Sequence, residues 1–139
     1  SGVALRTLPQ TLLAHARTQP GRLAQRVKRK GIWREYDFAH VLEQVRSIAL
    51  GVAALGLARG DTAVVIGENE PEHYWAVFAA QSLGAKTVSV YPDATAEEVR
   101  EELVRIGAPV LNVEMVAKTS EEHRSAIAEI DIEWSVLAN

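Results

Sequence analysis

The clearest pattern of apolar positions lies between Thr62 and Pro92. Two short β-branched runs, at 63–66 and 87–91, flank a helix-length segment from Glu70 to Leu83, and a glycine or proline follows each of the three. Short apolar runs on either side of a helix predict a βαβ unit, in which a right-handed crossover joins two parallel strands. We interpret both runs as apolar on both faces, which is typical of parallel strands covered on two sides.

Three elements are predicted ahead of this unit. The spacing of leucine and alanine over 8–18 predicts a short amphipathic helix. Alternation over 23–36, with a turn at Gly31, predicts a β-hairpin. Asp37 is a good N-cap, and the apolar stripe behind it predicts a long amphipathic helix over 38–55.

The segments after Pro92 predict further βα steps. Thr95 and Glu98 have the spacing of a capping box, at the start of a helix that ends near Ile106. The remaining segments predict a strand at 109–113, a helix capped by Thr119 or Ser120, and a strand at 132–137. The predicted fold is therefore α/β: a parallel, Rossmann-like β-α-β-α-β-α-β sheet, preceded by a helix, a β-hairpin and a long amphipathic helix.

The length of 139 residues suits one domain, which we predict to be a single N-terminal subdomain over 1–139. Residues 1–2 are interpreted as a scar of tag removal, 8–57 as helix, hairpin and long helix, and 62–139 as parallel βα units. A doubly wound sheet places its ligand at the carboxyl ends of its strands, where the strand order reverses. Because the βα series stops before such a site, we expect half of a larger fold.

Composition narrows the function classes. The net charge is −3, which provides no general attraction to nucleic acid or anionic membranes. The absence of cysteine excludes disulfides, thiolate catalysis and cysteine metal sites, and mildly favours a cytoplasmic location. No apolar run approaches the length of a transmembrane segment, and no secretory signal is visible.

One stretch is strongly basic. Six lysines and arginines occur between Arg22 and Arg34, and the next acid is Glu35. One interpretation is a solvated hairpin whose charges prevent an edge strand from pairing with other molecules. The alternative is a phosphate- or nucleic-acid-binding patch, for which Trp33 and Tyr36 are the only nearby aromatic residues.

No catalytic, cofactor-binding or metal-ligating residue is predicted. The turn at 67–72 carries one glycine and three glutamates, which suit the start of a helix and compete with phosphate there. It has no lysine and no G-x-G-x-x-G pattern, so we interpret this turn as one that caps the helix rather than one that binds phosphate. Tyr74, Trp75 and Phe78 are interpreted as core between helix and sheet. The histidines fall on predicted helices without metal-ligand spacing and are interpreted as surface residues: His15, His40, His73 and His123.

Three segments carry a resemblance to a known family. They read G-I-W-R-E-Y-D-F-A-H-V at 31–41, G-L-A-R-G-D-T-A-V-V-I-G-E-N at 56–69, and L-G-A-K-T-V-S-V-Y-P-D at 83–93. In this order and spacing the chain resembles the N-terminal portion of adenylate-forming enzymes, especially bacterial long-chain fatty-acyl-CoA synthetases. The resemblance extends from about Leu8 to Val113 and is faint beyond it.

The resemblance implies an ATP-dependent ligase that uses Mg²⁺ to form an acyl-adenylate and then transfers the acyl group to coenzyme A. The family's Ser/Thr/Gly-rich phosphate loop and its catalytic lysine have no counterpart here, so the isolated chain is expected to be inactive. Its partners would be the remainder of the ligase chain and a second copy bound through exposed apolar surface, without nucleic acid. The alternatives are a stand-alone dimerisation module and a nucleic-acid binder that uses the hairpin.

Overall fold

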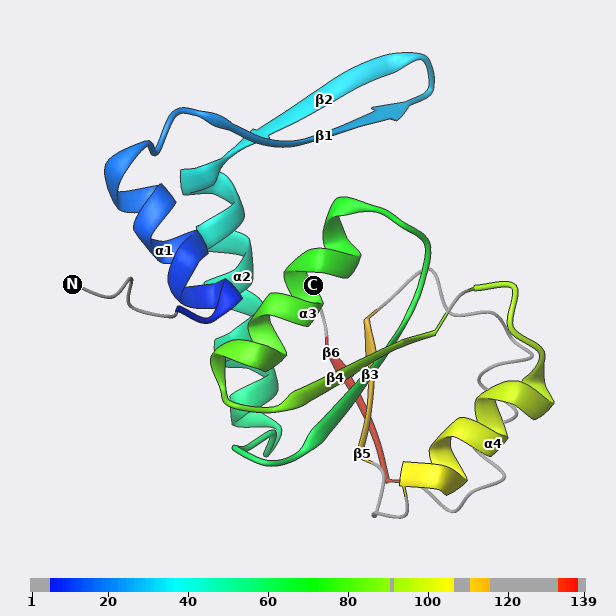
Figure 1. The fold of residues 1–139 in the computed structure, drawn as a ribbon. Helices are drawn as coiled ribbons and strands as arrows, with labels where there is room; N and C mark the ends of the chain where they lie inside the picture. Colours follow the sequence, from blue (N-terminus) through cyan, green and yellow to red (C-terminus); the bar gives the residue numbers. More distant parts are fainter. Residues whose placement is uncertain (1–5, 91, 107–110, 116–132, 138–139) are drawn as a thin grey trace. The chain divides into compact units, whose positions relative to one another are not determined.

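The computed structural model describes residues 6–90, 92–106, 111–115 and 133–137 (Figure 1). The chain divides into two compact units. The first unit comprises Ser1–Ala63 and Asn69–Thr87, and the second comprises Val64–Glu68 and Val88–Asn139. The predicted single subdomain over 1–139 stays a prediction.

The first unit contains three helices and a hairpin, as the sequence predicted. In chain order they are α1 (Leu8–Thr18), β1 (Leu23–Arg29), β2 (Ile32–Asp37), α2 (Phe38–Ala54) and α3 (Pro71–Ser82). Asp37 is confirmed as the N-cap of α2, since its Oδ1 accepts from the backbone N–H of His40 at 2.8 Å. Thr7 and Gln10 form a capping box at the start of α1 that we did not predict.

The hairpin has a two-residue turn at Lys30 and Gly31. Both residues have positive φ, at 50° and 78°. Such turns match the right-handed twist of the two strands, and glycine adopts this conformation without steric cost. The turn fixes an antiparallel register in which Lys28 lies opposite Trp33. In Figure 1 the hairpin extends beyond the N-terminal end of α2.

The core of the first unit lies among its helices. Its buried members come from α1, α2 and α3 and are Leu12, Val41, Val45, Trp75 and Ala79. Trp75 is thus core, as predicted, but it packs against the helices and the hairpin rather than against the β3–β4 sheet. Tyr74 was wrongly assigned to the core: it is 42% exposed, and its hydroxyl donates to Asn69 Oδ1 at 2.5 Å. Adjacent helical positions point about 100° apart, so only Trp75 faces inward.

The predicted βαβ strands are β3 (Thr62–Ile66) and β4 (Lys86–Val90), which pair with each other. The backbone N–H of Lys86 donates to the carbonyl of Asp61, and that of Gly67 donates to the carbonyl of Val90. Residue numbers rise in the same direction on the two strands from the first of these bonds to the second, so the strands are parallel. All residues of β3 remain partly exposed, in contrast to the predicted cover on two faces. Among the described residues β3 pairs with β4, and a pair of strands is too narrow to bury both of its faces.

The second unit contains α4 (Ala96–Ile106), β5 (Leu111–Met115) and β6 (Glu133–Leu137). The predicted capping box is present, because Glu98 accepts from the backbone N–H of Thr95 at 2.8 Å and Thr95 accepts from that of Glu98 at 3.2 Å. In this unit Val99 and Leu103 of α4 form a buried core, against which partly buried side chains pack: Val64, Ile66, Val90 and Ala94.

The last two strands are also parallel, as predicted, with Val113 opposite Ser135. The described strand β5 is Leu111–Met115, and positions 109–110 of the predicted strand lie outside the described residues. Within the described residues, β3 pairs with β4 and β5 with β6, so the joining of all four strands into one sheet stays a prediction. The predicted helix after Thr119 lies outside the described residues, as does His123.

Candidate functional site

The N-terminal end of α3 is the position where a nucleotide-binding βαβ fold would hold phosphate. Glu70 is the N-cap residue of α3, Pro71 follows it, and Glu72 lies in the first turn. The Glu70 side chain makes no capping hydrogen bond to the helix. A glutamate is too long to be a favoured N-cap, in contrast to Ser, Thr, Asp or Asn. The carboxylate of Glu70 therefore does not cap α3, in contrast to the capping role predicted for this turn.

Both carboxylates bind a guanidinium from the hairpin instead. Arg29 Nη2 lies 2.5 Å from Glu70 Oε2 and 2.7 Å from Glu72 Oε1, and its Nε donates to Glu70 Oε2 at 3.2 Å. The hydrogen bonds that Arg29 donates to Glu72 and, second, to Glu70 raise its pKa, so Arg29 stays protonated at every physiological pH. One positive charge against two negative charges leaves this cluster with a formal charge of −1.

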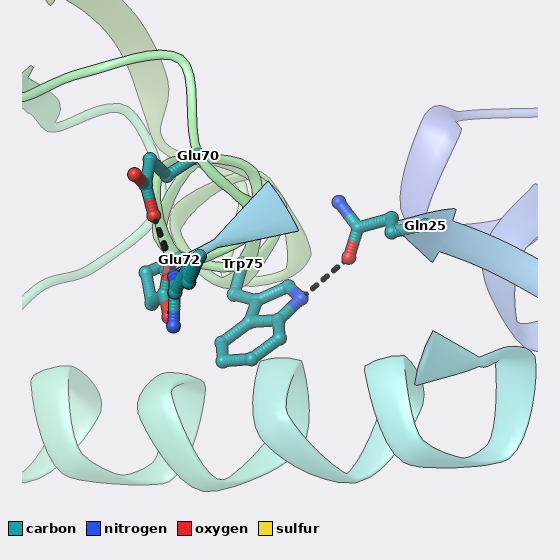
Figure 2. Close-up of polar contacts among 5 residues, drawn as sticks. Gln25, Glu70, Glu72 and Trp75 are labelled. Atoms are coloured by element: carbon teal, nitrogen blue, oxygen red, sulfur yellow. Dashed lines mark hydrogen bonds and ion pairs between the residues drawn. The ribbon is translucent and has the colours of Figure 1, made fainter. Parts of the chain in front are cut away.

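A second contact joins the same strand to the same helix. Trp75 Nε1 donates to Gln25 Oε1 at 2.7 Å, and Figure 2 shows this bond beside the two glutamates. Tyr36 lies edge-on to the indole of Trp75, with ring centroids 5.4 Å apart. Gln25 and Arg29 are four residues apart on β1, so both project from the same face of the strand. This face of the hairpin is therefore tied to α3 by polar bonds at two points.

Neither contact was predicted from the sequence. Arg29 was treated as one member of a basic run, and Glu70 as one member of an acidic turn. Period-2 alternation along β1 could have separated Arg29 from its exposed neighbours, since Gln25, Val27 and Arg29 are all partly buried. No pattern in the sequence identifies the partner of Arg29, 41 residues away.

The described histidines do not form a site. His15 stacks on Phe38, and the exposed His40 stacks on Tyr36, each with ring centroids 5.0 Å apart. His73 is partly buried, and this burial lowers its pKa from 6.5. His15 and His73 are thus less exposed than the surface positions predicted for them. No group of three or more potential metal ligands occurs among the described side chains.

A hollow of about 500 Å³ lies in the second unit, between the end of β4 and the start of α4. Three carboxylates line it, those of Asp93, Glu98 and Glu102, and its described lining includes no basic side chain. Triphosphate binding needs cations and N–H donors directed at the phosphate oxygens. The described lining of the hollow provides no such cation, and the guanidinium at the start of α3 is bound by two carboxylates, so neither place fits ATP with Mg²⁺.

A sequence model of the family described as AMP-binding enzyme matches residues 12–137. The chain belongs to this family. The match includes the three segments on which the predicted resemblance rests, and it continues past Val113, where the resemblance became faint. A membership that extends over nearly the whole chain also accounts for the order of its helices and strands.

The relatives include coenzyme A ligases. Over 118 residues the chain is 32% identical to the long-chain-fatty-acid–CoA ligase FadD15 of Mycobacterium bovis, and this match covers 84% of the chain and 18% of FadD15. The chain spans less than a fifth of this relative.

Solved structures show the same fold. The crystal structure of IdnL1 superimposes with a TM-score of 0.74 at 19% identity, over 99% of this chain and 27% of IdnL1. Acetoacetyl-CoA synthetase from Streptomyces lividans gives a TM-score of 0.73 at 23% identity, over 92% of this chain and 21% of the synthetase. The predicted α/β class is thus confirmed.

None of the described helices is both long enough and apolar enough to cross a bilayer.

Proposed function

We propose that this chain is the N-terminal structural segment of an AMP-forming acyl-CoA synthetase and has no catalytic activity alone. Together with the rest of such a ligase it would take part in the activation of a fatty acid with ATP and Mg²⁺, followed by transfer to coenzyme A. Support comes from the family match over 12–137 and from the identity to FadD15, whose name describes a long-chain-fatty-acid–CoA ligase.

The Arg29–Glu70–Glu72 cluster is the observation that supports a structural role most directly. The start of α3 is the natural anion site of a βαβ unit, but the one guanidinium at this site is bound by two carboxylates. A triphosphate would meet a net negative charge there and would have to displace Arg29 from both partners. We infer that ATP and Mg²⁺ are held by residues of the ligase that lie outside this segment.

An ATP–pyrophosphate exchange assay tests the proposed inactivity. The 139-residue chain, incubated with ATP, Mg²⁺, labelled pyrophosphate and a long-chain fatty acid, should give the background rate. FadD15 serves as the positive control, and the double variant E70Q/E72Q, which removes the competing carboxylates, should remain at background as well. Exchange above background by the unaltered chain would contradict the proposal.

A chimera tests the structural role. The matched 118-residue segment of FadD15 is replaced by the corresponding residues of this chain. The chimera should retain acyl-CoA formation, because the segment is expected to contribute no reacting group. A control chimera with Val99→Asp should lose it, since an unpaired charge would enter a fully buried position. A chimera that is folded by circular dichroism but inactive would show that the segment supplies a group needed for catalysis.

The predicted homodimer and the cytoplasmic location stay predictions. The exposed large apolar residues include Leu8 on α1 and Leu50 on α2, and isolated surface residues of this kind are normal for a monomer. Light scattering on the chain, at increasing concentration, distinguishes a monomer from a homodimer. A mass near twice that of the 15.2 kDa chain would support the dimerisation module.

A further inference from the structure

The two faces of the β1–β2 hairpin have different surroundings. Gln25 and Arg29 bond to side chains of α3 from one face. Because side chains alternate along a strand, Arg26 and Lys28 lie on the opposite face, and both are exposed. Trp33 lies directly opposite Lys28 in the register, so it shares that face. We name this side of the hairpin the outer face; it consists of Arg26, Lys28, Trp33 and Glu35.

An indole ring covered by cations is the centre of the outer face. Arg26 Cζ lies 4.1 Å from the centroid of the Trp33 ring, and Lys28 Nζ lies 5.7 Å from it. These are cation–π distances. Trp33 nevertheless remains 53% exposed, and Ile32, the first residue after the turn, is 65% exposed. The hairpin thus presents two large apolar side chains next to its tip, outside the core of the unit.

The charge of the outer face differs from that of the whole chain. The chain has a net charge of −3, but six of its 15 lysines and arginines lie between 22 and 34. Arg29 is neutralised by its two carboxylates on the inner face. On the outer side Arg26, Lys28 and the turn residue Lys30 face outward with Glu35 as the acid in the same register. The cations therefore outnumber the acid at this surface.

We propose that the outer face and the tip of the hairpin bind the surface of a bilayer that contains anionic phospholipid. Tryptophan favours the headgroup region, where its ring is buried and its N–H is solvated. Lysine and arginine are attracted to the negative surface potential of such a bilayer. Ile32 lies opposite Arg29 in the register and so belongs to the inner face; the apolar side chain that the outer face would insert between the headgroups is that of Trp33. This binding goes beyond the proposed ligase role and does not depend on it.

The geometry favours a lipid surface over a nucleic acid. A single-stranded nucleic acid binds by stacking bases on exposed aromatic faces. Here Arg26 lies over the ring of Trp33, so a stacked base would have to displace it. A lipid headgroup region needs no such displacement, because the guanidinium and the indole can both lie at the level of the phosphates.

Vesicle flotation of the 139-residue chain tests this proposal. The chain should float with phosphatidylcholine vesicles that contain about a third phosphatidylglycerol, and should not float with phosphatidylcholine alone, since about 5-fold in affinity is expected for each cation at the surface. By the same value, R26Q/K28Q/K30Q should weaken the partition by roughly 100-fold. Trp33→Ala should also weaken it and should abolish the quenching of tryptophan fluorescence by brominated lipid.

Matched controls separate this surface from general charge and from exposed aromatic area. The variant R6Q/R46Q/K86Q removes three exposed cations outside the hairpin, and Tyr74→Ala removes an exposed aromatic ring from α3. Both should float as the unaltered chain does, and circular dichroism should show that all variants are folded. Equal flotation with neutral and anionic vesicles, or an equal loss in the two triple variants, would overturn the proposal. Salt-dependent binding to a single-stranded oligonucleotide, lost in Trp33→Ala and without vesicle binding, would assign the surface to nucleic acid and overturn it too.

Discussion

The hydrogen bond between Trp75 and Gln25 should contribute measurably to the stability of the first unit. It joins the hairpin to α3 across 50 residues of sequence, and the indole that donates it is only 7% exposed (Figure 2). Gln25→Met keeps the length of the side chain but removes the acceptor. Trp75→Phe keeps an aromatic ring in the core but removes the donor. The two variants and their combination form a double-mutant cycle.

The expected magnitudes follow from burial. Gln25→Met leaves a buried N–H without its partner, which should lower the free energy of unfolding by about 1–3 kcal/mol. Trp75→Phe removes the N–H and roughly 50 Å² of buried ring, or roughly 1 kcal/mol at about 25 cal/mol per Å², in addition to the lost hydrogen bond. In the double variant no orphaned donor remains. It should therefore be about 1 kcal/mol more stable than the sum of the two single effects predicts.

Urea unfolding followed by far-ultraviolet circular dichroism measures the cycle, since tryptophan fluorescence changes with the substitution itself. Equal slopes of free energy against urea in all four proteins would show that the unfolded states are comparable. Strict additivity of the two single effects would refute the reasoning, because it would mean that the bond seen between Nε1 and Oε1 contributes no net stability.

Other parts of the molecule provide further tests. Val99→Ala removes two methyl groups from a side chain that is 0% exposed, and it should lower the free energy of unfolding, measured in urea, by about 2 kcal/mol. An unchanged urea midpoint would show that Val99 is not tightly packed. Burial lowers the pKa of His73 from 6.5, so the unfolded chain binds this proton more readily than the folded chain does. The contribution of neutral His73 to stability should therefore be complete above pH 6.5 and should decline as the pH falls below it. Thermal unfolding of His73→Gln should show a flatter decline with falling pH. Gly84 has a φ of +80°, and a Cβ there would lie 3.1 Å from Arg59 Cγ. Gly84→Ala should therefore lower the free energy of unfolding by about 1–2 kcal/mol, measured by thermal unfolding, and adding Arg59→Ala should restore only the steric part of this loss. Arg29→Met should accelerate amide exchange in β1 and β2 but not in α4, whereas equal rates throughout would show that the two carboxylates do not hold the hairpin.

The elements that were predicted correctly are those decided by neighbours in the sequence. Asp37 accepts from a backbone N–H three residues on, and Thr95 and Glu98 satisfy each other over the same distance. The turn at Gly31 needs only a residue that tolerates positive φ. Each of these interactions is complete within four residues, so no knowledge of the rest of the fold is needed to predict it.

The start of α3 shows where such reasoning stops. Three glutamates in the turn argue against a phosphate site, and this prediction needs no tertiary structure because the sign of a charge is a property of the residue itself. Which partner the carboxylates would take was not predictable, since Arg29 is one of six basic residues in its stretch. Their use as helix caps was the natural local expectation, and a guanidinium from β1 replaced it.

The sequence by itself determined the types and order of the helices and strands, the family to which they belong, and the concentration of positive charge in one hairpin. Only the tertiary structure decided which side of that hairpin meets α3, which of two adjacent aromatic residues is buried, and which arginine is neutralised. The physical reason is the range of the interactions. Caps, turns and periodicity act over a few residues, whereas the bonds of Gln25 and Arg29 to α3 exist only after segments 40 to 50 residues apart have packed together.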